Sequence, residues 1–236
     1  MQEIMTTGKL YIVATPIGNP KDITVRALHV LNNVDAIICE ELRVGSRLLN
    51  QFDIKTELLT LNEHNEAQEA QNIAVRIAKG ETMAIISDAG TPVFADPGQR
   101  LLELLYQMNV PVSPIPGPSS LMAAISLCDF PIDRFTFAGF PPRKSHLRED
   151  FLKIFCGKTE PVILMDTPYR LTKLLTEVQT VFGKQTEILL ACNLTQKKEA
   201  IFRGQIQDIL PKISGQKHEF ILILNLNQYR KPKIHG

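Results

Sequence analysis

Short apolar runs alternate with stretches of helical periodicity along the first half of the chain. Residues 9–14 predict a strand, and the apolar positions of residues 23–31 then recur at intervals of three and four, with Asp22 expected as the helix cap. Such alternation is typical of an α/β fold with a mainly parallel sheet. It continues through predicted strands at residues 35–39, 82–86 and 110–115 and predicted helices at residues 46–52, 65–79 and 99–108.

The alternation resumes beyond a turn formed by Pro116-Gly117-Pro118. We therefore expect two α/β domains, residues 1–117 and residues 118–236, with a ligand cleft between them and a basic tail at residues 229–233. Residues 198–202 are a candidate for an additional strand. The other elements expected in the second domain are strands at residues 135–137, 162–165, 186–191 and 220–224 and helices at residues 145–155, 170–182 and 205–213.

Composition narrows the class of protein only a little. Of the 236 residues, 44% are hydrophobic and 22% are charged, which is usual for a globular protein, and no apolar run is long enough to cross a bilayer. The first five residues lack a signal-peptide pattern, so we expect a cytoplasmic protein without a membrane partner. A net charge of +1 gives no general support for a nucleic-acid partner. The four cysteines are widely separated, which favours core positions over a metal site or disulfides.

The most informative segment is the loop from Ser87 to Gly98, which follows a predicted buried strand and precedes a predicted helix. Ligands of α/β proteins bind beside such strand ends. The loop contains two glycines, two prolines and two aspartates, so it is expected to be rigid. Its spacing matches neither the dinucleotide-binding fingerprint nor a P-loop. We therefore expect a different ligand.

Four separate stretches are similar to the motifs of one family. They are Ala14-Thr15-Pro16-Ile17-Gly18-Asn19, His64-Asn65-Glu66, the loop from Ser87 to Gly98 with Pro114-Ile115-Pro116-Gly117-Pro118-Ser119, and Gly139-Phe140-Pro141-Pro142-Arg143-Lys144. Their order and spacing, across residues 9–226, resemble those of the tetrapyrrole-methylase-fold methyltransferases. Within that superfamily they are most similar to the ribosomal RNA small-subunit methyltransferase I branch.

This resemblance implies an S-adenosylmethionine-dependent 2′-O-methyltransferase that acts on a cytidine ribose in the decoding region of small-subunit rRNA. It also implies two α/β domains of the tetrapyrrole methylase fold with the cofactor in the cleft between them, and a homodimer. By the family's pattern the cofactor is held by Pro16, Gly18, Asp88, Ala89, Gly90, Thr91, Ser119, Ser120, Met165 and Asp166.

Transfer of a methyl group to a ribose hydroxyl needs in-line positioning and a group that accepts the hydroxyl proton, which contributes roughly 100-fold or more. The candidate proton acceptors are Glu40, Glu41, His64, Glu66, Asp88 and Asp96, of which we expect Glu40, His64 and Asp96 to be catalytic. Purely structural roles remain open. Asp88 is also suited to capping a turn, Asp96 before Pro97 to capping a helix, and His64 to packing ahead of a helix.

Arg143, Lys144 and Arg148 are the expected contacts to RNA phosphates, because basic side chains follow the rigid Pro141-Pro142 pair. A solvated helix face balanced by Glu149 and Asp150 is the alternative.

The chain also departs from the rRNA branch. Asn193 stands where a glutamate is usual, Glu40-Glu41-Leu42-Arg43 replaces Glu-Asp-Thr-Arg, and Asp166 and Tyr169 replace a glutamate and a histidine. If the missing carboxylate is catalytic, Asn193→Glu is expected to raise turnover. Two rival functions remain: methylation of a small molecule such as a tetrapyrrole, and a non-catalytic role in RNA binding or ribosome assembly.

Overall fold

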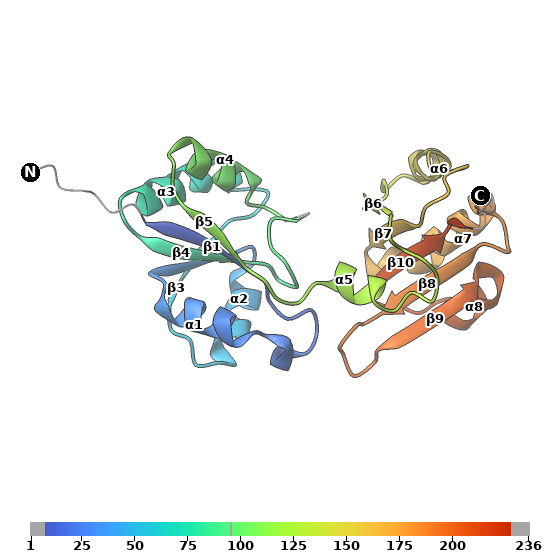
Figure 1. Cartoon of the computed structure of the whole chain (residues 1–236), viewed down its shortest axis with the longest axis horizontal. Helices are drawn as coiled ribbons and strands as arrows, with labels where there is room; N and C mark the ends of the chain where they lie inside the picture. Colours follow the sequence, from blue (N-terminus) through green and yellow to red (C-terminus); the bar gives the residue numbers. More distant parts are fainter. Residues whose placement is uncertain (1–7, 95, 228–236) are drawn as a thin grey trace, which may run out of the picture. The chain divides into compact units, whose positions relative to one another are not determined.

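The structure, a computed structural model, describes residues 8–94 and 96–227 and divides into two units, Met1–Ser119 and Ser120–Gly236 (Figure 1). The expected boundary after residue 117 lies two residues before this division. The basic tail at residues 229–233 lies outside the described residues. Each unit contains one five-stranded sheet with helices, so the α/β fold class predicted from the sequence is confirmed.

The sheet of the first unit is entirely parallel. Its strands are β1 (Lys9–Val13), β2 (Ala36–Cys39), β3 (Glu57–Thr60), β4 (Thr82–Ile86) and β5 (Val112–Ile115), in the order β3-β2-β4-β1-β5. All four neighbouring pairs are parallel. The carboxyl ends of the strands therefore meet at one edge of the sheet.

Helices cover both faces of this sheet (Figure 1). They are α1 (Val25–Asn33), α2 (Leu42–Asn50), α3 (Glu66–Ala78) and α4 (Gln99–Gln107). α1 and α2 share one buried cluster with the sheet, whereas α3 and α4 share the cluster on the opposite face. Burial on both faces explains why β2 and β4 are almost wholly apolar. α2 begins four residues before the helix predicted at residues 46–52, and β3 was not predicted.

The helix cap expected at Asp22 is wrong, and the helix cap left open as an alternative for Asp96 is not formed. Asp22 lies in a short 3-10 helix, Pro20–Asp22, and the cap of α1 is Thr24, whose Oγ1 accepts a hydrogen bond from the backbone N–H of Ala27 at 3.0 Å. Asp96 does not cap α4, because Gly98 occupies the N-cap position and Glu66 Oε1 accepts hydrogen bonds from the backbone N–H groups of Gly98 and Arg100. Glu66 thus serves a helix end, and the carboxylate of Asp96 is left for another role.

The sheet of the second unit is mixed, so the expectation of a mainly parallel sheet is wrong here. Only β6 and β7 are parallel, and the other neighbouring pairs are antiparallel. The strands are β6 (Thr136–Gly139), β7 (Val162–Asp166), β8 (Glu187–Cys192), β9 (Ala200–Gln205) and β10 (Phe220–Asn225), in the order β6-β7-β10-β8-β9. β9 is the additional strand anticipated near residues 198–202, shifted toward the C-terminus.

The helices of the second unit are α5 (Ser120–Ile125), α6 (Ser145–Lys153), α7 (Leu171–Phe182) and α8 (Ile206–Ile213), with a short 3-10 helix at Pro168–Arg170. α6, α7 and α8 bury their apolar residues against one face of the sheet in a single core cluster. The cysteines follow the predicted core positions only in part. Cys39 and Cys192 are buried, but Cys156 is exposed.

Candidate functional site

The loops that follow β1 and β4 are joined at the carboxyl edge of the first sheet. Thr15 and Gly90 form an isolated antiparallel bridge in which each backbone N–H donates to the other residue's carbonyl, at N···O distances of 2.8 and 3.1 Å. The fully buried Oγ1 of Thr15 also donates to the Ser87 carbonyl at 2.9 Å. The loop carrying Pro16 and Gly18 is therefore fixed beside the loop carrying Asp88 to Thr91.

The loop after β5 joins the same edge. Thr91 Oγ1 donates to the Pro118 carbonyl at 3.5 Å, and a Cβ on Gly117 would come within 3.1 Å of Ala14 Cβ. Gly90 adopts a φ of +89°, and a Cβ there would lie 3.3 Å from Ile17 Cγ2. This position needs glycine both for its backbone angle and for the close approach of the two loops.

The topology places these loops where α/β proteins bind ligands. β4 lies between β2 and β1. The helices after β2 and β1 cover one face of the sheet, and the helix after β4 covers the other. The loop after β4 therefore diverges from both neighbours, which is the arrangement at a topological switch point. The structure thus brings together the predicted cofactor residues of the loops after β1 and β4, which are Pro16, Gly18, Asp88, Ala89, Gly90 and Thr91.

Three carboxylates gather where β2 and β4 end. Glu40 directly follows β2, and Asp88 and Asp96 belong to the loop after β4. A cavity of about 10 Å³, enough for one water at most, is lined by Glu40 and Asp96 together with Cys39, Leu61, Ile85, Ile86, Ser87, Pro92 and Pro97. We call Glu40, Asp88 and Asp96 the acidic cluster.

Burial raises the pKa of each member of the acidic cluster, and repulsion from neighbouring carboxylates adds to it for Glu40 and Asp88. For Glu40, burial comes first, followed by the charges of Asp88, Asp96, Glu63 and Glu41. Burial, Glu41 and Asp96 raise the pKa of Asp88. Burial raises the pKa of Asp96 despite an opposing hydrogen bond with Ser87. Burial and the charge of Asp88 raise the pKa of the neighbouring Cys39 thiol to about 11. Such sites favour a bound cation or an incoming proton.

His64 stands apart from this cluster in its contacts. Its side chain is exposed, and its backbone N–H donates to Asn62 Oδ1 at 3.0 Å. Within the described residues its imidazole makes no hydrogen bond or ion pair. The structure therefore shows no contact that would orient His64 for catalysis.

The remaining predicted cofactor residues lie at the unit boundary and in the second unit. Ser119 is the last residue of the first unit and Ser120 begins α5, whereas Met165 and Asp166 end β7. Asp166 Oδ1 accepts from the Thr167 backbone N–H at 2.6 Å and pairs with Arg170 at 2.5 Å. Its other oxygen, Oδ2, is buried without a hydrogen-bond partner in the described part of the chain. Burial raises the pKa of Asp166, although Thr167 and Arg170 oppose it.

Arg148 is not a phosphate contact, which corrects the expectation from the sequence. Its side chain is fully buried and forms an ion pair with Glu177. The Nη atoms also donate to the carbonyls of Pro142 and Arg143, to Ser145 Oγ and to Glu177 Oε1. All five N–H donors of the guanidinium are thereby occupied. Arg143 and Lys144 are exposed, so they remain available.

Asn193 is a structural residue of the second unit. It is 8% exposed with a φ of +47°, and its Nδ2 donates to the Lys198 carbonyl at 3.2 Å. Nδ2 also lies 2.7 Å from His218 Nδ1, and Oδ1 accepts from the Glu219 backbone N–H. A glutamate has no N–H to donate, so it would lose both contacts of Nδ2. The expectation that Asn193→Glu raises turnover finds no geometric support.

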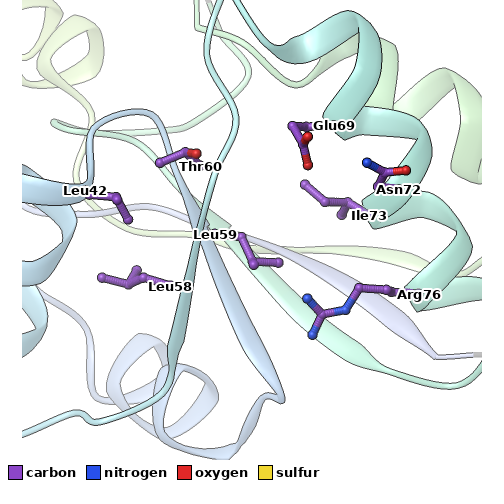
Figure 2. A pocket seen from close by; sticks show the side chains of 8 residues that line it. All are labelled: Leu42, Leu58, Leu59, Thr60, Glu69, Asn72, Ile73 and Arg76. Carbon is purple, nitrogen blue, oxygen red and sulfur yellow. The ribbon is translucent and has the colours of Figure 1, made fainter.

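A larger pocket of about 260 Å³ opens at edge strand β3 (Figure 2). Its apolar wall comes from Leu42, Leu58, Leu59 and Ile73. Arg76, the cation in the pocket, already pairs with Glu57 at 2.8 Å and with Glu81 at 2.7 Å. The loops at the carboxyl edge do not line this pocket, and Arg76 is already paired with two carboxylates. We therefore do not assign the site here.

The described residues offer neither a group of side chains arranged to hold a metal ion nor a helix suited to crossing a membrane. Within residues 8–94 and 96–227, no group of three or more His, Cys, Asp or Glu residues is arranged to hold a metal ion. Over the same ranges, none of the helices combines the length and apolar character needed to cross a membrane.

Relatives identify the family. A family model of the tetrapyrrole (corrin/porphyrin) methylases matches residues 9–210. The chain is 38% identical to the ribosomal RNA small subunit methyltransferase I of Xylella fastidiosa over 93% of this chain and 82% of that protein. It is 38% identical to the protein of that name from Escherichia coli O157:H7, covering 92% and 77% of the two chains. For the Thermotoga maritima protein of that name the identity is 37%, covering 89% and 94%.

Solved structures agree on the fold. A cobalt precorrin-4 methyltransferase superposes with a TM-score of 0.67 at 18% identity, covering 94% of this chain and 96% of that one. A uroporphyrin III C-methyltransferase from Thermus thermophilus gives 0.66 at 16% identity, covering 92% and 97%. The resemblance inferred from the four sequence motifs is thereby confirmed, and the chain belongs to the tetrapyrrole (corrin/porphyrin) methylase family.

Proposed function

We propose that this protein transfers a methyl group from S-adenosylmethionine to the 2′-hydroxyl of a cytidine ribose in small-subunit rRNA. The observation that carries the proposal is the 36–40% identity to proteins named ribosomal RNA small subunit methyltransferase I, over most of both chains. The joined loops and the acidic cluster at the carboxyl edge of the first sheet supply a site suited to this chemistry.

The residues at this edge fit the charge of the cofactor. S-adenosylmethionine supplies, when bound, an electrophilic methyl group on a positively charged sulfur. Repulsion within the acidic cluster, which raises the pKa values of Glu40 and Asp88, is relieved by a nearby cation. We assign binding to the loop of Pro16 and Gly18 and to the segment from Asp88 to Thr91. Contacts from Ser119, Ser120, Met165 and Asp166 stay predictions, and the unpartnered Asp166 Oδ2 is an acceptor suited to a cofactor N–H or O–H.

We assign proton acceptance to a carboxylate oxygen of Glu40. A ribose hydroxyl loses its proton as the new O–C bond forms, and a carboxylate with a raised pKa is a stronger base than an ordinary one. Burial and four neighbouring carboxylates raise the pKa of Glu40, more neighbours than act on Asp88 or Asp96. In this proposal Asp96 maintains the negative field around Glu40, and His64 takes no part.

The remaining parts of the proposal concern partners and location. Arg143 and Lys144, both exposed, are assigned to phosphates of the rRNA. A homodimer and a cytoplasmic location are included because the family resemblance implies the first and the rRNA substrate the second.

The test is methyl transfer by the purified protein with labelled S-adenosylmethionine, using small ribosomal subunits and, separately, a uroporphyrinogen as acceptors. We expect label in the rRNA of the subunits and none in the tetrapyrrole. Label in the tetrapyrrole alone would assign the protein to small-molecule methylation. Binding to subunits without label in either acceptor would assign it to a non-catalytic role.

A further inference from the structure

One face of helix α2 carries only polar and basic side chains. Arg43, Ser46, Arg47, Asn50 and Gln51 follow one another at intervals of three, one, three and one residues, which places them along one stripe of the helix. Together they line an open hollow of about 520 Å³ on the surface. We call these five residues the α2 stripe.

The two arginines of the α2 stripe lack anionic partners. Both are exposed, and among the described residues neither side chain forms an ion pair or hydrogen bond. Arg76, Arg100, Arg148 and Arg170 are paired with carboxylates, whereas Arg26, Arg134 and Arg143, like the two arginines of the stripe, have no ion pair among the described residues. α2 itself contains no acidic residue, and like charges four residues apart repel each other. Arg47 lies in the last turn, where a cation interacts favourably with the helix dipole, but neither guanidinium group has an anionic partner among the described residues, so both are available to an external anion.

The chemistry of the α2 stripe matches a sugar–phosphate backbone. A guanidinium fork binds phosphate oxygens in a bidentate manner, and the Ser46 hydroxyl and the Asn50 and Gln51 amides can donate to phosphate or accept from ribose hydroxyls. Four residues of helix rise about 6 Å, so Arg43 and Arg47 can engage successive phosphates of one strand. The α2 stripe contains no aromatic side chain on which a base could stack, so the contact is to the backbone.

The position of α2 connects the stripe to the proposed reaction. β2 ends at Cys39, Glu40 follows, and α2 begins at Leu42. Arg43 therefore lies in the first turn of the helix, three residues after Glu40 in the sequence, and the α2 stripe extends away from the carboxyl edge of the sheet. We propose that the α2 stripe binds the sugar–phosphate backbone of single-stranded RNA adjacent to the methylated nucleotide. This inference rests on the proposed function, because it takes Glu40 to mark the position of the target ribose.

The test compares the parent with Arg43→Gln/Arg47→Gln. The matched control is Lys79→Gln/Arg100→Gln, which removes the same charge from exposed positions at the ends of α3 and α4 on the opposite face of the sheet. Binding of a labelled single-stranded, cytidine-containing RNA oligonucleotide is measured by fluorescence anisotropy across a range of salt concentrations. Methyl transfer to small subunits is measured in parallel.

Each phosphate contact to a single strand contributes about 0.7 to the slope of log K against log salt, so losing two contacts flattens the slope by about 1.4 and weakens binding on the order of tenfold at 0.1 M salt. The control is expected to keep the parent's slope, and the KM for subunits is expected to rise only in the Arg43/Arg47 variant.

An unchanged slope and KM in that variant, with methylation intact in the parent, would overturn the inference while leaving the proposed function standing. RNA binding that depends on the α2 stripe in a parent that transfers no methyl group would retain the stripe and overturn the proposed function instead. If the Arg43/Arg47 variant lost binding to anionic lipid vesicles while its RNA binding stayed unchanged, the inference that the α2 stripe binds RNA would be overturned.

Discussion

Arg148 provides a sharp test of the architecture of the second unit, because the sequence suggests a substrate contact and the structure shows a buried ion pair. Arg148→Ala removes a fully buried guanidinium and leaves Glu177, with a side chain 9% exposed, without its partner. It also removes the donors to the carbonyls of Pro142 and Arg143. Breaking a buried pair on one side typically costs about 3–5 kcal/mol. That is a large part of the roughly 5–15 kcal/mol that stabilises a domain.

Urea unfolding followed by circular dichroism measures this loss. Arg143→Ala is the matched control, because it removes an exposed arginine from the loop that precedes α6 and is expected to change stability by no more than about 0.5 kcal/mol. An Arg148→Ala protein within about 1 kcal/mol of the parent, but deficient in RNA binding, would refute the structural role. It would restore Arg148 to the substrate surface.

The ion pair also predicts an acid dependence. Burial alone would raise the pKa of Glu177, but hydrogen bonds from Arg148 and Ser145 outweigh it and hold that pKa below its usual value. A depressed carboxylate pKa contributes stability that is present above the unfolded value of about 4.3 and is lost as the pH falls through the folded value. Glu177→Gln should therefore be less stable than the parent at neutral pH, and the difference should shrink in acid. A constant difference across that range would contradict this assignment.

Three further outcomes are expected. Glu40→Gln should lower kcat by roughly 100-fold. It should also make the protein more stable at neutral pH, because a carboxylate with a raised pKa favours the folded state only in acid. A stability gain that persists unchanged below pH ~4 would contradict the repulsion within the acidic cluster. Gly90→Ala should lower the free energy of unfolding by about 1–3 kcal/mol and weaken cofactor binding measured by calorimetry. Gly157, at φ +79° with open space around it, is the control, and Gly157→Ala should show only the cost of the backbone strain. Equal losses of stability in the two variants would show that the contact with Ile17 is unimportant. Asn193→Glu should destabilise the second unit without raising turnover, and a faster, stable variant would return this position to the active site.

The sequence predicts the elements of this protein better than their pairing. Hydrophobic periodicity locates the buried strands β1, β2 and β4, because strands covered on both faces are nearly continuous apolar runs. It misses β3, an edge strand whose residues are only half-buried or exposed. It also cannot distinguish the mixed sheet of the second unit from a parallel one, because β7, β8 and β10 are almost wholly buried and therefore also appear as nearly continuous apolar runs.

The candidate site shows the same division. Strand-end loops and carboxylates can be read from the sequence, so Asp88, Asp96 and Glu40 were found. Whether a polar residue has a structural role depends on its contacts with residues far away in the sequence. Glu66 caps α4 across 32 residues, and Arg148 pairs with Glu177 across 29. The cluster of basic residues near Arg148 suggested a basic surface, but it carries no information on whether the Arg148 side chain is buried.

The most direct test of the central claim is mass spectrometry of small-subunit rRNA from cells that lack the gene. The account predicts that one 2′-O-methylcytidine is missing, that it returns when the parent protein is expressed, and that it does not return with Glu40→Gln despite normal accumulation of that variant. Unchanged rRNA methylation in the deletion strain would contradict the proposed function, and full restoration by Glu40→Gln would contradict the assignment of Glu40 as proton acceptor.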